Sequence, residues 1–432
     1  MPHFVRHTSP DAEPMEWLRK HAWKLAILLL PWQMRWFSEG ISLGGLPWEQ
    51  GRWSVYGSWF VMTIVTGLAF SQQGASLTWT KRQKQIMIAG ISLFAFPSIF
   101  TMSWQATAQW WIEVALLAGL VAPLIRLRVS RESLAFWLIV SLIPHACLAL
   151  WQWQAQMVVG TKWLGMATQD PLIPGVSVIE TSSGRFLRAY GGFPHPNIFG
   201  GWLAGALTVS VWLVSRLSKV WQRWFLTACT GLFSAVFVLT FARGAWISVV
   251  VGIALATLLA WKEKKGRVHV WRVLVVMALA VTVTAWQTRE LIAVRMTTAP
   301  RLEAKSVDER REGWENGQRL FEEHASVGVG LNATAWGIAR QTGSEPPRSP
   351  LLPHVVTLLI LDEVGVIGSV GFVLLAWCVW IRRQNRSAWL LLAVWLVLGC
   401  FDHYPWSLWA GRSWTALVIA WILLAEDTEK RP

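Results

Sequence analysis

Twelve apolar stretches of 15 to 27 residues constrain the fold of this chain more than any other feature. A helix needs about 20 apolar residues to cross the hydrocarbon core of a bilayer. The stretches lie at about 22–38, 53–71, 85–103, 107–125, 133–153, 197–214, 223–241, 244–261, 270–287, 354–380, 387–401 and 406–425. We therefore predict an all-α polytopic membrane protein with about 12 transmembrane helices. Pro31 and Arg35 favour a kinked or partly interfacial first helix, and the eleventh stretch is short for a full crossing.

The composition agrees with a membrane protein. Only 15% of the residues are charged and the mean hydropathy is +0.40, whereas soluble domains contain about 25% charged residues. The net charge of +14 comes from short basic clusters between apolar stretches, which favours contact with membrane lipids over nucleic-acid binding. The four cysteines lie in apolar stretches without metal-ligand spacing, and nucleotide-binding and zinc motifs are absent from the sequence. We expect no metal and no cofactor.

Basic residues predict the orientation, because Lys and Arg stay on the cytoplasmic side of short loops. Five alternate loops carry 17 of them, and the opposing short loops carry three, which are Arg52, Arg243 and Arg412. Both termini are then cytoplasmic and the number of spans is even. The first twenty residues are mostly polar and lack the features of a signal peptide, so we expect the first apolar stretch to remain as an anchor.

This orientation leaves two long loops on the outer face, where we expect the function. The predicted order is a cytoplasmic segment (1–21), helices 1–5 (22–153), a periplasmic loop (154–196), helices 6–9 (197–287), a large periplasmic loop (288–353), helices 10–12 (354–425) and a cytoplasmic tail (426–432). In the large loop, Ser306 can cap an amphipathic extramembrane helix with the sequence SVDERREGWENGQRLFEEHA.

Ionisable residues against apolar spans cost free energy unless they are paired or hydrated, so each is a functional candidate. Four outer places hold such residues: Arg185, Arg188, His195 and Asn197 before the sixth stretch, Arg243 in a tight connection, His354 with Asp362 and Glu363 at the tenth, and Asp402 with His403 in the last outer loop. Plainer interpretations are lipid-headgroup contacts for the arginines, a structural role for His354, and folding ion pairs for the acids.

These residues share one face by topology. Several arginines with a histidine suit a site that holds a diphosphate and deprotonates a hydroxyl. A membrane-bound donor with a diphosphate head fits this chemistry.

Four segments in order carry a family resemblance: RAYGGFPHPNIFGG (188–201), TFARGAWISVVVG (240–252), RREGWENGQRLFEEHASVGVGLNATAW (310–336) and PHVVTLLILDEVGVIG (353–368). With them the chain resembles the superfamily of O-antigen ligases and O-antigen polymerases, bacterial membrane glycosyltransferases whose substrates hang from undecaprenyl diphosphate. The resemblance covers roughly residues 190 to 370.

The resemblance implies roles for particular residues. Arg188 and Arg243 would contact the donor diphosphate, and His354 would be the general base or would position the acceptor. Arg310 would be a secondary or structural residue. Further substrate-binding candidates are Arg185, His195, Asn197, Asp402 and His403. The family often has Asn where this chain has Val355, so His195 and His403 remain alternative bases.

The resulting hypothesis is an inverting, metal-independent glycosyltransferase at the periplasmic face of the bacterial inner membrane. It would move a glycan from undecaprenyl diphosphate to lipid A-core, as a ligase does. The alternatives are a polymerase, whose acceptor is another lipid-linked glycan repeat, and, with less support, transfer to a protein. A lipid-linked glycan flippase or other transporter also fits twelve spans, but inverted repeats and paired interrupted helices are absent from the sequence.

Overall fold

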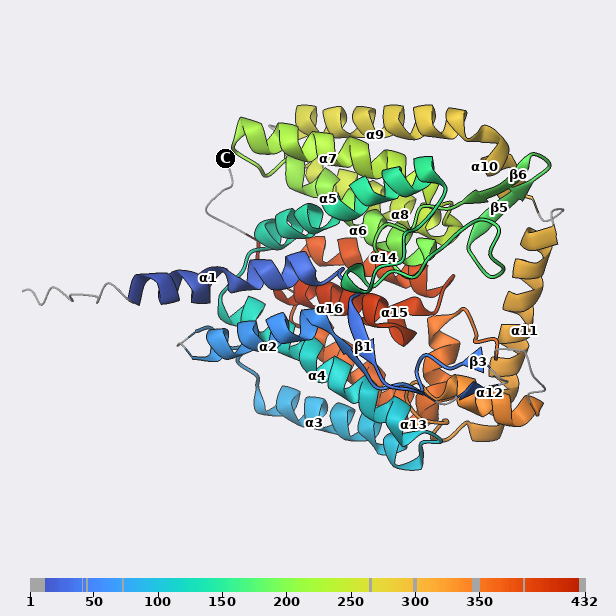
Figure 1. The fold of residues 1–432 in the computed structure, drawn as a ribbon. Coiled ribbons are helices and arrows are strands. Elements are labelled where there is room, and N and C mark those ends of the chain that lie inside the picture. Colours follow the sequence, from blue (N-terminus) through green and yellow to red (C-terminus); the bar gives the residue numbers. More distant parts are fainter. Residues whose placement is uncertain are drawn as a thin grey trace, which may run out of the picture.

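The structure is a computed structural model that describes residues 12–40, 42–43, 46–71, 74–263, 266–297, 301–343, 350–383 and 385–426. It is mostly helical (Figure 1). Half of the expected N-terminal segment (1–21) and nearly all of the expected C-terminal tail (426–432) lie outside the described residues.

Every predicted apolar stretch contains a helix. These helices are α1 (Ala12–Leu29), α2 (Gly57–Phe70), α3 (Lys81–Ala95), α4 (Trp104–Arg126), α5 (Arg131–Ala155), α6 (Pro196–Val214), α7 (Val220–Leu239), α8 (Arg243–Ala260), α9 (Arg267–Gln287), α13 (Val356–Trp380), α14 (Trp389–Gly399) and α16 (Trp409–Leu423). Among the described residues, seven helices, α4 to α9 and α13, are long and apolar enough to cross a membrane. The other five are shorter or more polar, so a count of twelve spans stays a prediction.

The first apolar stretch is helical only in part. Helix α1 starts at Ala12 and ends at Leu29, and a strand, β1 (Arg35–Phe37), follows Pro31. Proline lacks the N–H group that a helix interior needs, so the chain leaves the helix here. The expectation of a helix over 22–38 is therefore wrong in its second half.

Among the described residues, three short antiparallel sheets of two strands each add to the expected all-α fold. Strand β1 pairs with β4 (Ser54–Tyr56), β2 (Ser42–Leu43) with β3 (Leu46–Pro47), and β5 (Val178–Thr181) with β6 (Gly184–Leu187). The hairpin of β5 and β6 belongs to the loop between α5 and α6. Figure 1 shows β3, β5 and β6 on the same side of the molecule as α11 (Arg301–His324).

Helix α6 forms the centre of the bundle. All of its residues except Asn197 are buried, and it packs against α5, α7, α8 and α14. Glycines permit close approaches: a Cβ atom added at Gly205 would lie 1.9 Å from the Trp414 ring of α16. Helices α7 and α9 form one edge of the bundle, and α3 and α13 form the opposite edge (Figure 1). The start of α6 therefore has a fixed position between the outer loops.

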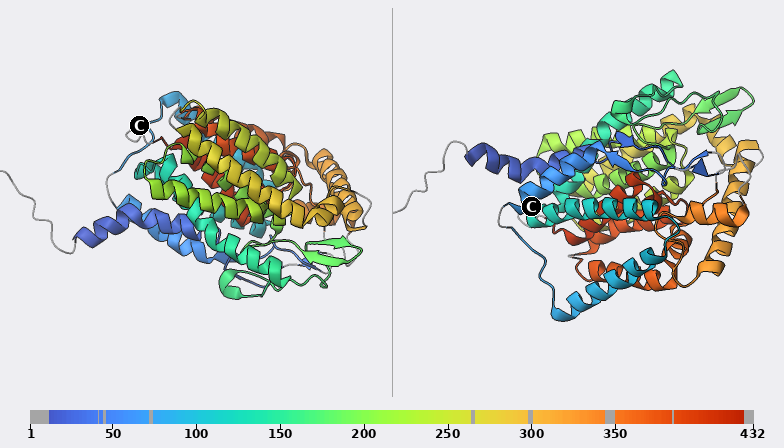
Figure 2. Two further views of the ribbon diagram at one scale, coloured as in Figure 1. Left: turned by 90° about the horizontal axis from the view of Figure 1, so that it is seen from above. Right: turned by 60° about the horizontal axis from the view of Figure 1, so that its bottom comes forward.

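In the described residues of the region 288–353 the chain forms three helices, α10 (Arg289–Arg295), α11 and α12 (Thr334–Thr342). Helix α11 buries one face, with Glu303, Asn316 and Leu320 among its buried residues. It begins before Ser306, so Ser306 lies inside the helix and does not cap it. Figure 2 shows α11 across the ends of the long helices rather than among them.

A kink in α13 explains the glycines that follow α11. Gly365 has φ 60° and ψ −168°, which interrupts the helical hydrogen bonds. The segment 325–330 runs beside the kink and restores them: the Val366 amide donates to the Ala325 carbonyl (2.8 Å), and the Gly330 amide donates to the Glu363 carbonyl (2.8 Å). Such substitute hydrogen bonds are what an irregular backbone needs inside a membrane protein.

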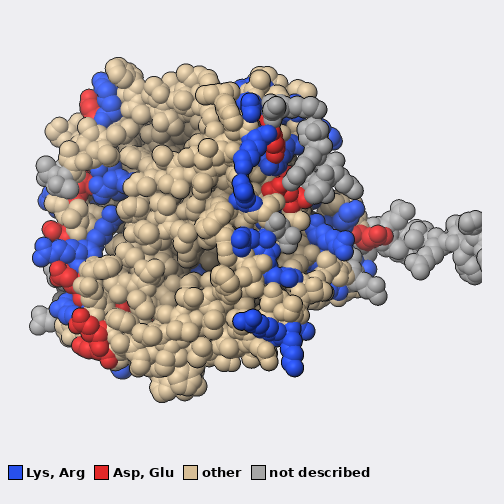
Figure 3. Space-filling model, turned by 180° about the vertical axis from the view of Figure 1, so that it is seen from behind, with Lys and Arg blue, Asp and Glu red and all other residues tan. Residues whose placement is uncertain are grey.

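Charged side chains lie at the two ends of the molecule in Figure 3, with a broad surface that lacks them in between. One end carries mostly Lys and Arg, and the other end carries both signs. Helix α9 exposes large apolar side chains along its length, such as Val268, Leu279 and Trp286. This distribution is that of a protein with an apolar belt facing lipid.

Candidate active site

A chain of hydrogen bonds joins three of the four outer loops. Arg188, which is 5% exposed, follows β6. Its Nε donates to the Thr240 carbonyl at 2.8 Å and its Nη2 donates to Asn197 Oδ1 at 2.6 Å. Asn197 Nδ2 in turn donates to Asp402 Oδ2 at 2.9 Å. Residues about 200 positions apart are therefore fixed to one another.

Two histidines flank Asp402. The Nδ1 atom of His354 lies 3.9 Å from Asp402 Oδ1, and the rings of His354 and His403 have centroids 5.3 Å apart. The backbone amide of His403 donates to Asp402 Oδ1 at 2.9 Å. Burial opposes ionisation of Asp402, but its interactions with His354 and His403 and the hydrogen bond from Asn197 outweigh burial and hold its pKa below the usual range. Asp402 is thus a carboxylate at neutral pH.

The three histidines differ in what their ring nitrogens contact. His195 accepts a hydrogen bond from the Asn197 amide on Nδ1 (3.1 Å), and its Nε2 lies 2.7 Å from Ser177 Oγ. His403 Nδ1 lies 2.6 Å from Ser407 Oγ. Burial lowers the pKa of His195 to about 3 and that of His403 to about 4, so both rings are neutral at pH 7.

His354 has the available nitrogen. Its buried Nδ1 faces Asp402, whereas no hydrogen bond among the described residues engages its Nε2, and the side chain as a whole is 32% exposed. Val355, the residue before α13, makes no side-chain cap. Of the alternative bases that the sequence left open, the geometry favours His354 over His195, whose two ring nitrogens are both engaged.

A second cluster, of arginines around Glu303, adjoins this network. Arg243 is the first residue of α8; its Nη1 donates to the Arg295 carbonyl (3.1 Å) and its Nη2 lies 3.3 Å from Glu303 Oε2. Arg295 pairs with the other oxygen of Glu303 and donates from Nε to the Phe241 carbonyl at 3.2 Å. Burial and the charge of Arg295 lower the pKa of Arg188 to about 9, which leaves Arg188 positive at pH 7.

The remaining predicted residues lie farther out. Arg310, on α11, is near enough to Arg243 for their charges to interact. Arg185 sits on β6 opposite Glu180, and no hydrogen bond or ion pair in the described part of the chain joins it to the network of Arg188. The structure therefore brings together seven of the nine predicted residues, with Arg310 on α11 farther out and Arg185 on the hairpin.

Arg295 and Glu303 were not predicted. Both belong to the large outer loop, whose nine acidic and nine basic residues balance, so no single one stands out by sequence. The sequence offered one signal for Arg295: it follows the end of the ninth apolar stretch by a few residues, which keeps it near the membrane boundary.

Arg412 has a different place from the one expected. It lies within α16, not in an outer loop, and it forms a buried ion pair with Glu113 of α4. Its Nη1 also donates to the Trp406 carbonyl (2.8 Å) and to Asn332 Oδ1 (3.2 Å). Because its side chain is only 7% exposed, we assign it to folding rather than to substrate binding.

One group of described residues has the chemistry of a metal site. Ligand atoms of His354, Asp402 and His403 lie within 4.8 Å of one another. Two imidazoles and a carboxylate suit a transition metal such as zinc. The same three groups also suit proton transfer without a metal.

The comparisons with known proteins connect these clusters to a family. Residues 228–373 match the profile of the family described as O-antigen ligase. Over this stretch the chain is similar to O-antigen ligases. The match confirms the predicted resemblance to the superfamily of O-antigen ligases and polymerases. No curated protein and no solved structure matches the chain significantly.

The O-antigen ligase match spans only part of the site. It runs from α7 into α13 and contains Arg243, Arg295, Glu303 and His354. The other residues of the network, from Arg188 to Asn197 and from Asp402 onward, lie outside it, and the structure alone connects them to the matched segment.

Proposed function

We propose that the chain is a glycosyltransferase of the bacterial inner membrane that moves a glycan from undecaprenyl diphosphate to a hydroxyl of lipid A-core at the periplasmic face. The acceptor oxygen forms a bond to the anomeric carbon while the bond from that carbon to the diphosphate breaks, with inversion. The acceptor proton passes to His354, and the electron pair leaves with the diphosphate oxygen.

The observation that carries this proposal is the arrangement of His354, whose buried Nδ1 faces the ionised Asp402 and whose Nε2 is engaged by no hydrogen bond among the described residues. A general base must have a nitrogen that accepts a proton and must lie where a substrate can reach it. The partial exposure of His354 meets the second requirement. The neighbouring carboxylate stabilises the imidazolium that forms in the transition state, and their 3.9 Å separation can shorten when substrate binds. Asp402 is thus a positioning residue.

The arginine cluster supports a diphosphate donor. Arg243 and Arg295 already hold a carboxylate, that of Glu303, between their guanidinium groups. Guanidinium forks bind carboxylates and phosphates with the same bidentate geometry. A diphosphate that replaces Glu303 at Arg243, and extends toward the positive Arg188, would have its developing charge neutralised as the sugar departs.

The position of the site supports the periplasmic side. The network lies at the helix ends opposite the connections that hold Arg126 and Arg131, Arg216 and Lys219, and Arg267. Basic loops face the cytoplasm, so the site would face the periplasm. Its ionisable residues gather at helix ends rather than near the middle of the bundle, where transporters usually bind their substrates.

The family match does not distinguish a ligase from a polymerase, so an experiment must identify the acceptor. A purified-protein assay in EDTA, with undecaprenyl-diphosphate glycan as donor, decides it. A glycan on lipid A-core supports the ligase, and a lengthened undecaprenyl-linked chain formed without core supports the polymerase. The absence of any transfer would refute the enzymatic proposal.

His354→Ala tests the mechanism in the same assay. We expect transfer to fall by at least about a hundredfold, the usual contribution of a general base, with the protein still folded. His269→Ala is the matched control, because His269 lies in the first turns of α9 at the opposite end of the bundle. Full activity in His354→Ala would remove this residue from the mechanism.

A further inference from the structure

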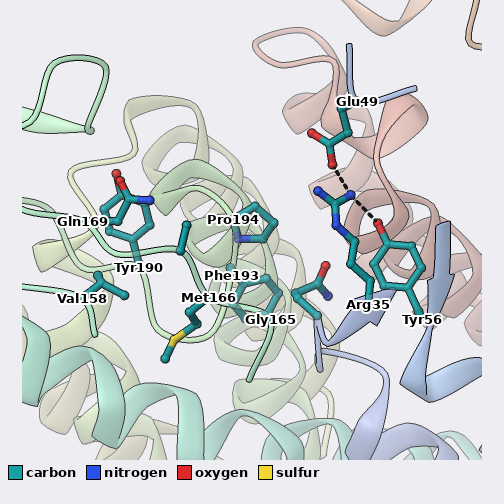
Figure 4. A pocket seen from close by; sticks show the side chains of 12 residues that line it. Arg35, Glu49, Tyr56, Val158, Gly165, Met166, Gln169, Tyr190, Phe193 and Pro194 are labelled. Carbon is teal, nitrogen blue, oxygen red and sulfur yellow. Dashed lines mark hydrogen bonds and ion pairs between the residues drawn. The ribbon is translucent and has the colours of Figure 1, made fainter. Parts of the chain in front are cut away.

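A cavity beside the candidate active site has no role in the steps above. It has a volume of about 150 Å³ and lies between the chain that follows α1 and the loop that precedes α6 (Figure 4). A cavity of this size holds one six-membered ring. Arg35, Glu49 and Tyr56 form one wall, and Tyr190 and Phe193 belong to the other.

The first wall is polar but close to neutral. Arg35 Nη1 donates to Glu49 Oε1 at 2.6 Å and to the Tyr56 hydroxyl at 3.3 Å. The side chains of Arg35 and Glu49 are 30% and 47% exposed, so both can meet a ligand. A guanidinium has five N–H donors and a carboxylate has two acceptor oxygens, which leaves hydrogen-bonding capacity on both partners. Because the two charges offset each other, the wall suits neutral hydroxyl groups better than a phosphate.

The second wall is mostly apolar, with Gln169 as its polar member. Val158, Tyr190 and Phe193 are nearly completely buried, and Met166 lies beside them. Tyr190 accepts a hydrogen bond from the Ser177 amide at 2.8 Å, which fixes its ring. Figure 4 shows these side chains facing Arg35 across the cavity. A pocket with apolar and aromatic surface on one side and a few oriented polar groups on the other fits a sugar, which has C–H faces and equatorial hydroxyls.

The cavity adjoins the histidines. Pro194, in its lining, directly precedes His195. The charge of Glu49 acts on His403, and the rings of His403 and His354 lie tilted to each other with centroids 5.3 Å apart. Arg243, by contrast, contacts Arg295 and Glu303 at the start of α11. An inverting displacement needs the acceptor on the face of the sugar that is opposite the departing diphosphate, and a cavity beside the base is placed for it.

We propose that the pocket of Arg35, Glu49 and Tyr56 binds an uncharged sugar unit of the acceptor and presents its hydroxyl to His354. This inference rests on the proposed transferase function. It makes Arg35 and Glu49 determinants of acceptor specificity, without a part in donor binding or in proton transfer.

The test is the transfer assay with the acceptor concentration varied at saturating donor, and then the reverse. In Arg35→Gln and in Glu49→Gln we expect the KM for lipid A-core to rise about ten- to a hundredfold, as for the loss of hydrogen bonds to charged groups, with kcat and the donor KM within twofold. Arg52→Gln is the matched control, because Arg52 belongs to the same segment and stacks on Phe37 outside the cavity lining; its KM should not change.

Two results would overturn the pocket assignment: an unchanged acceptor KM in both folded variants, or a rise confined to the donor KM. If Arg35→Gln does not fold, Glu49→Gln alone decides. Binding of lipid-free core oligosaccharide to the purified protein separates the pocket from the transferase proposal. A wild-type protein that binds the oligosaccharide, loses it on Arg35→Gln and yet transfers nothing would refute the enzymatic function while keeping the pocket. Conversely, the wild-type protein could transfer the glycan normally without binding the oligosaccharide, while the variants keep the wild-type KM. That result would refute the pocket and keep the enzymatic function.

Discussion

Replacing Asp402 by Asn removes one negative charge beside His354 and keeps the shape of the side chain. At 3.9 Å, two unit charges interact by about 4 kcal/mol with an effective dielectric constant of 20. His354 is 32% and Asp402 14% exposed, and water at this boundary screens the pair, so we expect a loss of about 1–2 kcal/mol in transition-state stabilisation. This corresponds to transfer that is about 5- to 30-fold slower.

The assay is single-turnover transfer with saturating donor and acceptor, in four proteins: wild type, Asp402→Asn, His354→Ala and the double variant. Because Asp402 acts through the imidazolium of His354, Asp402→Asn should slow the wild type and leave the residual rate of His354→Ala unchanged. Asp308→Asn, on an exposed turn of α11, is the control for loss of a carboxylate. Equal slowing by Asp402→Asn in both backgrounds would refute the coupling and leave Asp402 with a structural role only.

Three further predictions follow from the contacts described. Acidification from pH 7 to 5.5 should lower the unfolding temperature, because the pKa values of His195 and His403 in the folded protein are lowered to about 3 and 4. These two histidines then take up protons below about pH 6.5 only in the unfolded chain, which costs on the order of 1 kcal/mol of folding stability per residue and pH unit. An unfolding temperature that does not change with pH would contradict this prediction. Micromolar Zn²⁺ should inhibit transfer reversibly by occupying the nitrogen of His354, with EDTA restoring the rate; insensitivity to Zn²⁺ would argue against that ligand geometry. Arg412→Met should destabilise the fold by about 3–5 kcal/mol, since it leaves Glu113 buried and unpaired, and an unchanged thermal midpoint would show that this pair is not needed.

The positions of the long helices follow from the sequence, because a bilayer demands runs of apolar residues whose length is set by its thickness. All twelve apolar stretches contain helices. The details that failed depend on local contacts. The second half of the first stretch leaves the helix at Pro31 and pairs as β1 with β4, and such pairing of short strands has no strong local signal. Helix α11 likewise begins ahead of Ser306, a good capping residue, and its first turn includes the buried Glu303.

The sequence predicted which residues form the site, but it did not predict which of their atoms contact one another. Topology placed Arg188, Asn197, His354 and Asp402 on one face, and the structure joins them within hydrogen-bond or ion-pair distance. Their roles depend on which ring nitrogen or oxygen is engaged, and this follows from packing that the sequence does not encode in any short pattern. Arg295 is the clearest case, because its importance comes only from its contact with Glu303.

The rigidity of the network has a structural origin in α6. Asn197, its only residue that is not buried, sits at the start of the most enclosed helix of the bundle. The next turns of α6 approach the segment after Asp402 so closely that a Cβ atom at Gly201 would lie 1.9 Å from the Tyr404 hydroxyl. The bond between Asn197 and Asp402 therefore joins two elements that are already in direct contact, and little entropy is lost in holding it. Arg188 reaches this fixed pair from the connection after β6 and His354 reaches it from the connection before α13, where Asn197 and Asp402 offer partners at set positions. A proton acceptor and an anion-binding group can be held at a constant separation in this way, which a reaction with a departing diphosphate and an attacking hydroxyl on opposite faces of one sugar requires.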